Sequence, residues 1–355
     1  MKNNDIAKVE NLKHPIDTFI IRWNVTKLCN YNCDFCIQGN KEKHIIDSKG
    51  ESLELRTKIC DRIIKFIEEE LNNKYKNVNI YLLGGEVTIL KDFLDILKKL
   101  CNCKFKGTLK IHITTNFSMS ENAILKMKKV FNSIENKKYK RILSISCDYY
   151  KPFTTEKEFI KKIKLLSNKN VFDVLINLFK KSNIKLGIFI FNKLKKQSSI
   201  IVSIGYPIVD DNDCKDFFKF KRKYFMICDS ISSIIIRDYK TNISEKNKQK
   251  LIKQNKNVIK VTLKNNEVHY FHNTSKISLA IDDMDHFNPK GFLCDAGMYN
   301  ISISNLGVVS RCQTCPLKTK ICDILDDNIK LLDKKFKCPT TTCNCTLYRV
   351  IENIK

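Results

Sequence analysis

Hydrophobic positions along residues 17–168 alternate between two periods. Four segments are apolar and rich in β-branched residues, which predicts buried strands: 17–26, 77–86, 108–117 and 141–150. Four further segments repeat their apolar residues at helical spacing, which predicts amphipathic helices: 52–73, 89–102, 120–134 and 155–168. Strands that alternate with helices of about twelve or more residues indicate βαβ units and a parallel sheet. We therefore expect an α/β fold, with a further strand at 185–192.

The pattern changes after residue 205. Residues 206–284 are charged and irregular, with one hairpin expected around 257–271, and seven cysteines gather after residue 293. We expect four parts: an N-terminal segment 1–16, an α/β domain 17–205, a connecting region 206–284 and a small cysteine-rich α+β module 285–355.

Composition places the chain among globular proteins without a membrane span. Hydrophobic residues make up 43% of the 355 residues, which is enough to bury a large core. No apolar run approaches the roughly 18 residues that a bilayer requires, and residues 1–19 contain no apolar signal-peptide core. We therefore expect a cytoplasmic protein, in which the 16 cysteines indicate metal or redox chemistry rather than a disulfide framework.

The formal net charge of +26 comes mainly from lysines that are spread over the whole chain. A nucleic-acid surface usually shows arginines, or basic runs interleaved with aromatic residues. We interpret the charge as a solvated lysine-rich surface, and we expect neither a membrane nor a nucleic acid as partner. Affinity for RNA or another acidic partner is the alternative that the charge alone permits.

Three cysteines, Cys29, Cys33 and Cys36, lie within the eight residues CNYNCDFC that follow the first predicted strand. In parallel α/β folds, ligands bind at the carboxyl ends of the strands. Three thiolates there can hold three irons of a [4Fe–4S] cluster and leave the fourth iron open for a cofactor or substrate. The alternatives are chance cysteines, or a zinc site that lacks one ligand or takes His44 as its fourth.

The spacing of this triad resembles the signature of the radical S-adenosylmethionine (SAM) enzymes. That signature is a cysteine, three residues, a second cysteine, any residue, an aromatic residue and a third cysteine, and residues 29–36 match it without departure. The resemblance implies that Phe35 packs near the adenine of SAM. It also implies the fold, a partial (βα)6 barrel over residues 17–205 followed by the cysteine-rich module.

The resemblance extends to the end of the next strand. Gly84, Gly85 and Glu86 stand where the family has a Gly-Gly-Glu turn, and Val87 replaces the proline that usually follows. Glycines let the backbone approach a ligand closely, and Glu86 can accept a hydrogen bond from the methionine ammonium of SAM.

Two later strand ends match the family less closely. Asn116 lies where the family often has Thr-Asn-Gly, and Phe117 replaces the glycine. Ser146 and Asp148 stand where the family often has a serine and an aspartate that contact the ribose or the carboxylate of SAM. We carry Asn116, Ser146 and Asp148 over as candidate cofactor-binding residues. For the last two, an ordinary turn or helix-cap role is the alternative.

The resemblance also implies a reaction. In the family, the open iron chelates the amino and carboxylate groups of SAM. One electron, supplied to the cluster by a donor such as flavodoxin or ferredoxin, cleaves SAM to methionine and a 5′-deoxyadenosyl radical, which abstracts a hydrogen atom from the substrate. The protein then has to position the reactive atoms and exclude water.

The C-terminal cysteines form a second candidate metal site. Cys294 and Cys312 flank a stretch whose alternating apolar positions around residues 305–307 predict a hairpin, which would bring the two thiols together. This stretch resembles the opening of the auxiliary-cluster modules called SPASM and twitch. The spacing from Cys338 onward departs from the SPASM pattern, and a zinc ribbon is the alternative.

The resemblance to these modules implies at least one auxiliary [4Fe–4S] cluster. We expect Cys294 and Cys312 as two of its ligands, completed by two of the candidates Cys338, Cys343 and Cys345. The role of Cys315 and Cys322 is left open: they are either extra ligands or cysteines that bind no iron.

We expect an enzyme that modifies a peptide or protein side chain, because auxiliary modules of this kind often accompany that task. The short segment before Cys29 argues against an N-terminal leader-binding domain. The alternative is oxidation or rearrangement of a small molecule, which a compact chain with one auxiliary cluster suits. RNA modification is favoured by charge alone, and a non-enzymatic metal-binding protein leaves Gly84-Gly85-Glu86 unexplained.

Overall fold

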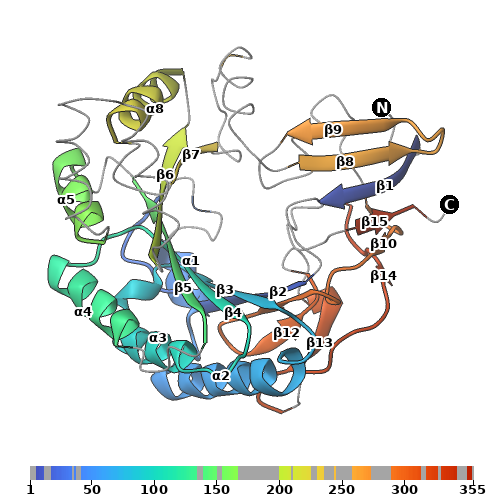
Figure 1. The fold of residues 1–355 in the computed structure, drawn as a ribbon, viewed down its shortest axis with the longest axis horizontal. Helices are drawn as coiled ribbons and strands as arrows, with labels where there is room; N and C mark the ends of the chain where they lie inside the picture. The colour runs from blue at the N-terminus through green and yellow to red at the C-terminus, as the bar shows by residue number, and fades with distance from the viewer. Residues whose placement is uncertain are drawn as a thin grey trace.

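In the computed structural model, the strands of the described residues form two sheets, and the larger is a curved, mostly parallel one (Figure 1). The structure describes residues 5–11, 17–33, 36, 41–133, 139–149, 154–166, 200–208, 211–224, 230–235, 244, 258–272, 289–312, 317–326, 329–341 and 350–353. The strand expected at 185–192 lies outside these residues.

The larger sheet contains a series of parallel strands that neighbour one another in chain order. These strands are β2 (Thr18–Thr26), β3 (Asn77–Gly84), β4 (Thr108–Thr115), β5 (Arg141–Asp148), β6 (Ile200–Ile208) and β7 (Ser230–Ile235). Parallel strands wound in one direction, with helices between them, are the arrangement of an open (βα) barrel. The expected α/β fold with a partial barrel is therefore confirmed.

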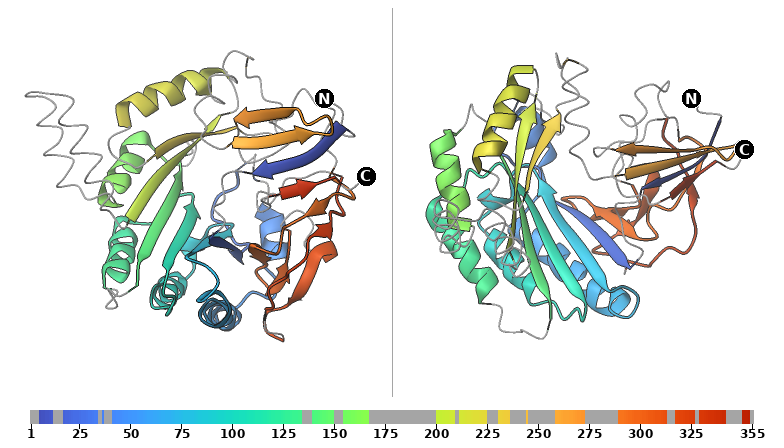
Figure 2. Two further views of the ribbon diagram at one scale, coloured as in Figure 1. Left: turned by 45° about the vertical axis from the view of Figure 1, so that its right-hand side comes forward. Right: turned by 45° about the horizontal axis from the view of Figure 1, so that its top comes forward.

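Helices cover the outer, convex face of this sheet (Figures 1 and 2). They are α2 (Leu53–Phe66) with a π-helical continuation (Ile67–Leu71), α3 (Phe93–Cys101), α4 (Glu121–Asn132), α5 (Glu156–Leu166) and α8 (Asp211–Tyr224), while the short helix α1 (Lys41–Asp47) follows the cysteine loop. Two begin at serines whose side chains accept from a backbone amide of the first turn, Ser52 before α2 and Ser120 before α4. In the part of the chain that the structure describes, no helix is long and apolar enough to cross a membrane.

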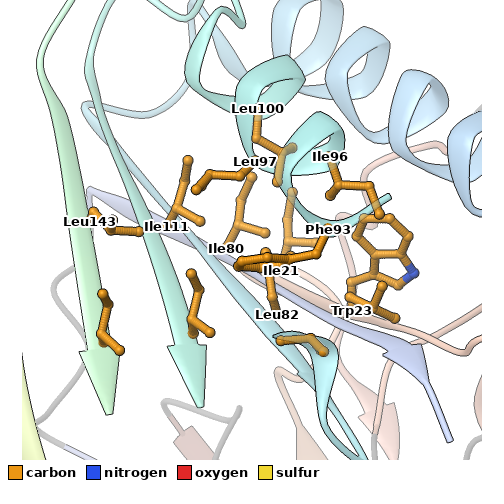
Figure 3. Packing of buried hydrophobic residues seen from close by; sticks show 14 of the residues in the cluster. Ile21, Trp23, Ile80, Leu82, Phe93, Ile96, Leu97, Leu100, Ile111 and Leu143 are labelled. Atoms are coloured by element: carbon orange, nitrogen blue, oxygen red, sulfur yellow. The ribbon is translucent and has the colours of Figure 1, made fainter. Parts of the chain in front are cut away.

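The core between sheet and helices follows from the two hydrophobic periods. Every second residue of a strand faces the helices, so Ile21 and Trp23 of β2 and Ile80 and Leu82 of β3 are fully buried. They pack against the apolar stripe of α3, which includes Leu97 (Figure 3). Burial of these side chains is the main stabilising contribution to the sheet.

The parallel sheet continues beyond residue 205, where we placed the end of the barrel. Strand β6 crosses this position, and β7 pairs with it in parallel, with Ser203 opposite Ser230. Part of the region 206–284 therefore belongs to the barrel sheet. The reason is that α8 carries buried apolar residues at helical spacing and connects the two strands.

The second sheet is antiparallel and joins both ends of the chain. Its strands, in spatial order, are β14 (Phe336–Lys337), β10 (Leu293–Cys294), β15 (Val350–Glu352), β1 (Ile6–Asn11), β8 (Val258–Leu263) and β9 (Val268–His272). The pairing of β8 with β9 confirms the hairpin expected at 257–271. Strand β1 comes from the segment 1–16, which we had set apart from the C-terminal module, yet it pairs with β15.

The C-terminal hairpin connects the module to the barrel. Strands β11 (Asn300–Ile303) and β12 (Val308–Ser310) pair antiparallel, which confirms the hairpin expected around residues 305–307. Strand β11 also pairs in parallel with β2, and β12 pairs with β13 (Lys320–Asp323). The larger sheet is therefore completed by strands from the far end of the chain (Figure 2).

Ile80→Ala should lower the free energy of unfolding by about 2–5 kcal/mol, because it leaves a cavity beneath α3. Leu125→Ala on α4 is the matched control, since Leu125 is 50% exposed and its loss should change stability by less than about 0.5 kcal/mol. Urea unfolding under anaerobic conditions measures both. Similar losses in the two variants would contradict the assigned core.

Candidate active site at the carboxyl ends of the parallel strands

The cysteine triad lies directly beyond the carboxyl end of β2. Cys29, Cys33 and Cys36 are each half-buried, and Cys36 N donates to Cys33 O at 3.0 Å. In the described part of the chain, no three His, Cys, Asp or Glu side chains converge as the ligands of one metal ion do. Phe35 lies outside the described residues.

The two glycines at the end of β3 hold the backbone that leads into this loop. Gly85 N donates to Thr26 O at 3.0 Å, and Glu86 N donates to Leu28 O at 2.8 Å. A Cβ atom on Gly85 would lie 2.1 Å from Leu28 O, and one on Gly84 would lie 2.2 Å from Thr26 O. We expected these glycines to let the backbone approach a ligand. In the structure they also let two segments of the protein approach each other.

His44 joins the same backbone to a cysteine of the triad. Its Nδ1 lies 2.8 Å from Lys27 O, so this nitrogen carries the proton that the carbonyl accepts. Its Nε2 lies 3.6 Å from Cys36 Sγ. The ring is buried on α1, which follows the loop, and it therefore ties the end of the triad to its beginning.

Glu86 is fully buried, and its carboxylate connects the end of β3 to the end of β4. Its Oε1 accepts from Thr88 N at 3.0 Å, from Thr88 Oγ1 at 2.5 Å and from Thr115 Oγ1 at 2.9 Å. Its Oε2 accepts from Asn116 N at 2.6 Å. Burial raises the pKa of Glu86, and these hydrogen bonds oppose that rise. Oε2 has one donor among the described residues and, as a carboxylate oxygen, can accept another.

Asn116 reaches from β4 to the cysteine loop. Its Nδ2 donates to Asn30 Oδ1 at 2.9 Å and lies 3.9 Å from Cys29 Sγ. The next residue, Phe117, has a φ of 58°, the left-handed conformation that a glycine adopts without strain. Its ring is buried against Phe159, with 5.6 Å between the ring centroids. The turn thus has a backbone conformation that favours glycine, although a phenylalanine occupies it.

Asp148 ends β5 with a carboxyl group that its surroundings do not satisfy. Its Oδ1 is buried and has no hydrogen-bond partner among the described residues. Burial raises the pKa of Asp148 to about 7, and the nearby charge of Glu86 adds to the effect. Ser146 lies two residues earlier on the same side of β5 and is partly exposed. Asp148 therefore presents an unsatisfied buried oxygen, near enough to Glu86 for the two charges to interact.

The inner face of the barrel carries a polar row that sequence reasoning missed. Arg22, Tyr81, His112 and Ser144 are cross-strand neighbours on β2, β3, β4 and β5. The Arg22 guanidinium lies 5.5 Å from the Tyr81 ring centroid, the Tyr81 and His112 rings are 4.8 Å apart, and His112 Nδ1 lies 3.0 Å from Ser144 Oγ. The signal available in the sequence was a polar residue at every second position of strands that are otherwise apolar.

Three of the C-terminal cysteines share one apolar core. Cys294, Cys312 and Cys338 are buried together with apolar residues of β1 and β15. Cys338 N donates to Phe292 O at 2.8 Å, which places it beside β10. Burial raises the pKa of the Cys338 thiol, and the neighbouring Cys312 contributes. Cys322 is buried in the other core, that of the barrel. Cys315, Cys343 and Cys345 lie outside the described residues.

Comparison with known proteins identifies the family. The model of the Radical SAM superfamily matches residues 23–220, which is more than half of the chain. A probable GTP 3′,8-cyclase of Thermoplasma volcanium is 31% identical over 111 residues, which are 31% of this chain and 27% of that protein. The chain is therefore matched to only about a quarter of this curated relative.

Two solved structures resemble the chain over most of its length. Native anSMEcpe with bound AdoMet and a Kp18Cys peptide is 14% identical, with a TM-score of 0.46, over 88% of this chain and 78% of that one. Streptococcus suis SuiB bound to its precursor peptide SuiA is 13% identical, with a TM-score of 0.48, over 88% of this chain and 63% of that one. At such low values, neither likeness identifies a substrate for this chain.

This chain belongs to the radical SAM superfamily, whose members are enzymes. Membership implies a [4Fe–4S] cluster and SAM as cofactors. The residues at the carboxyl ends of the strands fit both groups, because three thiols are available for iron and an unsatisfied buried carboxyl oxygen lies on the same side of the sheet.

Gly85→Ala should reduce the iron bound by the triad after anaerobic reconstitution, because the added Cβ would collide with Leu28 O and displace the cysteine loop. Gly291→Ala is the control. Its added Cβ meets nothing within 4 Å, and it tests the effect of backbone strain alone at a φ of +87°. Iron and sulfide analysis should show a loss only in the Gly85 variant. Equal iron content in both variants would contradict the contact.

Asp148 should make the stability of the protein fall as the pH rises from about 4 to about 7. The folded chain binds a proton with a pKa of about 7, whereas the ordinary value is 3.8, so the folded state holds more protons in this window. Asp148→Asn should remove this dependence, which amounts to roughly 4 kcal/mol over the full window. Urea unfolding at several pH values measures it. Asp95→Asn, at an exposed position, should keep the wild-type slope.

Proposed function

We propose that this radical SAM enzyme modifies a peptide or protein side chain by hydrogen abstraction. The observation that carries the proposal is that the triad, Glu86, Asn116 and Asp148 all lie at the carboxyl ends of neighbouring parallel strands, where Asn116 contacts both Glu86 and Cys29. This end of the strands is where α/β folds build a binding site.

Each candidate residue has a role in this proposal. Cys29, Cys33 and Cys36 hold three irons of the [4Fe–4S] cluster. Glu86 Oε2 accepts from the SAM ammonium in addition to Asn116 N, which it already accepts from. Gly84 and Gly85 set the position of the loop, while Phe35 packs near the adenine. Asn116, Ser146 and Asp148 contact the ribose or carboxylate of SAM.

The cluster and SAM together supply one chemical capability, a 5′-deoxyadenosyl radical formed by one-electron cleavage of SAM. The chain has to orient SAM and keep water away from the radical. Asp148 Oδ1, which lacks a partner among the described residues, is suited to orient a hydroxyl or an ammonium. Phe117 and Phe159 supply a buried aromatic wall behind the end of β4.

We further propose an auxiliary [4Fe–4S] cluster in the C-terminal module. Burial of Cys294, Cys312 and Cys338 in one core supports it, because three thiols with apolar surroundings can hold a cluster out of water. Cys343 or Cys345 completes the ligand set in this proposal. Cys322 is assigned no iron, since it lies in the barrel core.

The substrate and the electron donor are proposed from these features. A module with its own cluster suits a peptide or protein substrate, with electron transfer to or from the substrate radical. A flavodoxin or ferredoxin is the proposed electron donor, and the net charge of +26 would favour an acidic one. A small-molecule substrate is the second candidate, favoured by the partial identity to a probable GTP 3′,8-cyclase.

Replacing Cys29, Cys33 and Cys36 together by Ala should abolish formation of 5′-deoxyadenosine. The wild type should hold about eight irons per chain, and the triad variant should keep about four in the auxiliary cluster. The measurements are iron and sulfide content and 5′-deoxyadenosine production by anaerobic, dithionite-reduced protein.

Cys294→Ala combined with Cys312→Ala is the matched control, and it should lose about four irons while the triad keeps its own. Undiminished 5′-deoxyadenosine from the triad variant would sink the assignment of the triad. Zinc in place of iron in the C-terminal module would sink the auxiliary cluster.

A further inference from the structure

Glu51 lies where the cysteine loop begins, in the connection between α1 and α2. Its side chain is only 2% exposed. Its Oε2 accepts from Thr26 Oγ1 at 2.6 Å, and its Oε1 accepts from Lys27 N at 2.7 Å. Thr26 Oγ1 in turn accepts from Leu28 N at 3.0 Å. One carboxylate thus orients all three residues that precede Cys29.

Asn305 brings the C-terminal hairpin to the same carboxylate. It lies in the turn between β11 and β12 and is itself buried. Its Nδ2 donates to Glu51 Oε1 at 2.8 Å and to Asp47 O at 3.1 Å. A residue from the far end of the chain is therefore linked by one side chain to the loop that carries the triad.

Arg56 and Asp92 form a buried ion pair next to the Glu51 carboxylate. Arg56 donates to Asp92 from Nε at 2.8 Å and from Nη2 at 2.9 Å. Its Nη1 lies 3.9 Å from Glu51 Oε2. A buried carboxylate with a cation nearby and donors on both oxygens is well compensated, so its geometry is held tightly.

We propose that Glu51 is a positioning residue for the cluster-binding loop, and that Asn305 couples this loop to the C-terminal module. The inference rests on the proposed function of the triad. If Glu51 changes position, residues 26–28 lose their common acceptor and Cys29 moves relative to Glu86 and Asn116. Displacements of about 1 Å in such a site can reduce rates by roughly a hundredfold.

The test compares Glu51→Gln and Asn305→Ala with matched controls in the full-length, anaerobically reconstituted protein. Glu54→Gln removes an exposed acid from the first turn of α2, three residues after Glu51, and Leu306→Ala changes the exposed neighbour of Asn305. The readouts are iron content, the electron paramagnetic resonance spectrum of the reduced cluster with and without SAM, and SAM affinity by calorimetry.

Glu51→Gln should keep most of its iron, alter the cluster spectrum and weaken SAM binding by roughly tenfold, the effect of losing about one charged hydrogen bond. Asn305→Ala should give the same spectral change with a smaller loss of affinity. The controls should match the wild type. The double variant should be less affected than the sum of the single effects, because both residues act through one contact.

A merely structural role would give a different result. The variants would then unfold at lower urea concentration, yet the folded, reconstituted protein would show the wild-type spectrum and affinity, and this outcome overturns the proposal. Additive effects in the double variant would overturn the coupling through Asn305. If wild-type protein binds iron but does not respond to SAM, the proposed function fails. Glu51 is then judged by the spectrum without SAM, which the Gln variant should still alter.

Discussion

The candidate site depends on how the backbone of residues 26–28 is held. Three separate segments bind it: the amides of Gly85 and Glu86 from the end of β3, the ring of His44 from α1, and the carboxylate of Glu51 from the turn before α2. The loop that carries the triad has little regular structure of its own. Its geometry must come from such neighbours, because a flexible loop would have to lose its conformational entropy when it binds a cofactor.

The two faces of β2 separate the two cores of the protein. Ile21 belongs to the core beneath the helices, whereas its neighbour Ile20 packs with the buried cysteines of the C-terminal module. Successive residues of a strand point to opposite faces, so the module lies against the inner side of the barrel. The inner side also carries the polar row from Arg22 to Ser144. The C-terminal cysteines Cys294, Cys312 and Cys338 therefore lie on the inner side of β2, opposite the core beneath the helices.

Local patterns were enough to predict the barrel, because the strand and the helix of each βαβ unit can each be recognised from the spacing of their own apolar residues. The triad and the Gly-Gly-Glu turn could be found because their spacing is short and continuous. The contact between Glu51 and Asn305 could not, since it joins residues 254 positions apart. The strand β1 was missed for the same reason: six residues show no period that reveals a partner as distant as β15.

The pairing of the chain's two ends also dictates an order of assembly. Asn353 donates to Ile6 O, a contact between residues 347 positions apart, and β11 covers an edge of β2 that is synthesised long before it. Such distant pairings form slowly, because the entropy of closing a large loop is lost before the contacts between the strands contribute any stabilisation. During synthesis the nascent barrel therefore presents the edge of β2 uncovered until the residues of β11 have been made, and an uncovered edge strand is a site where aggregation can begin.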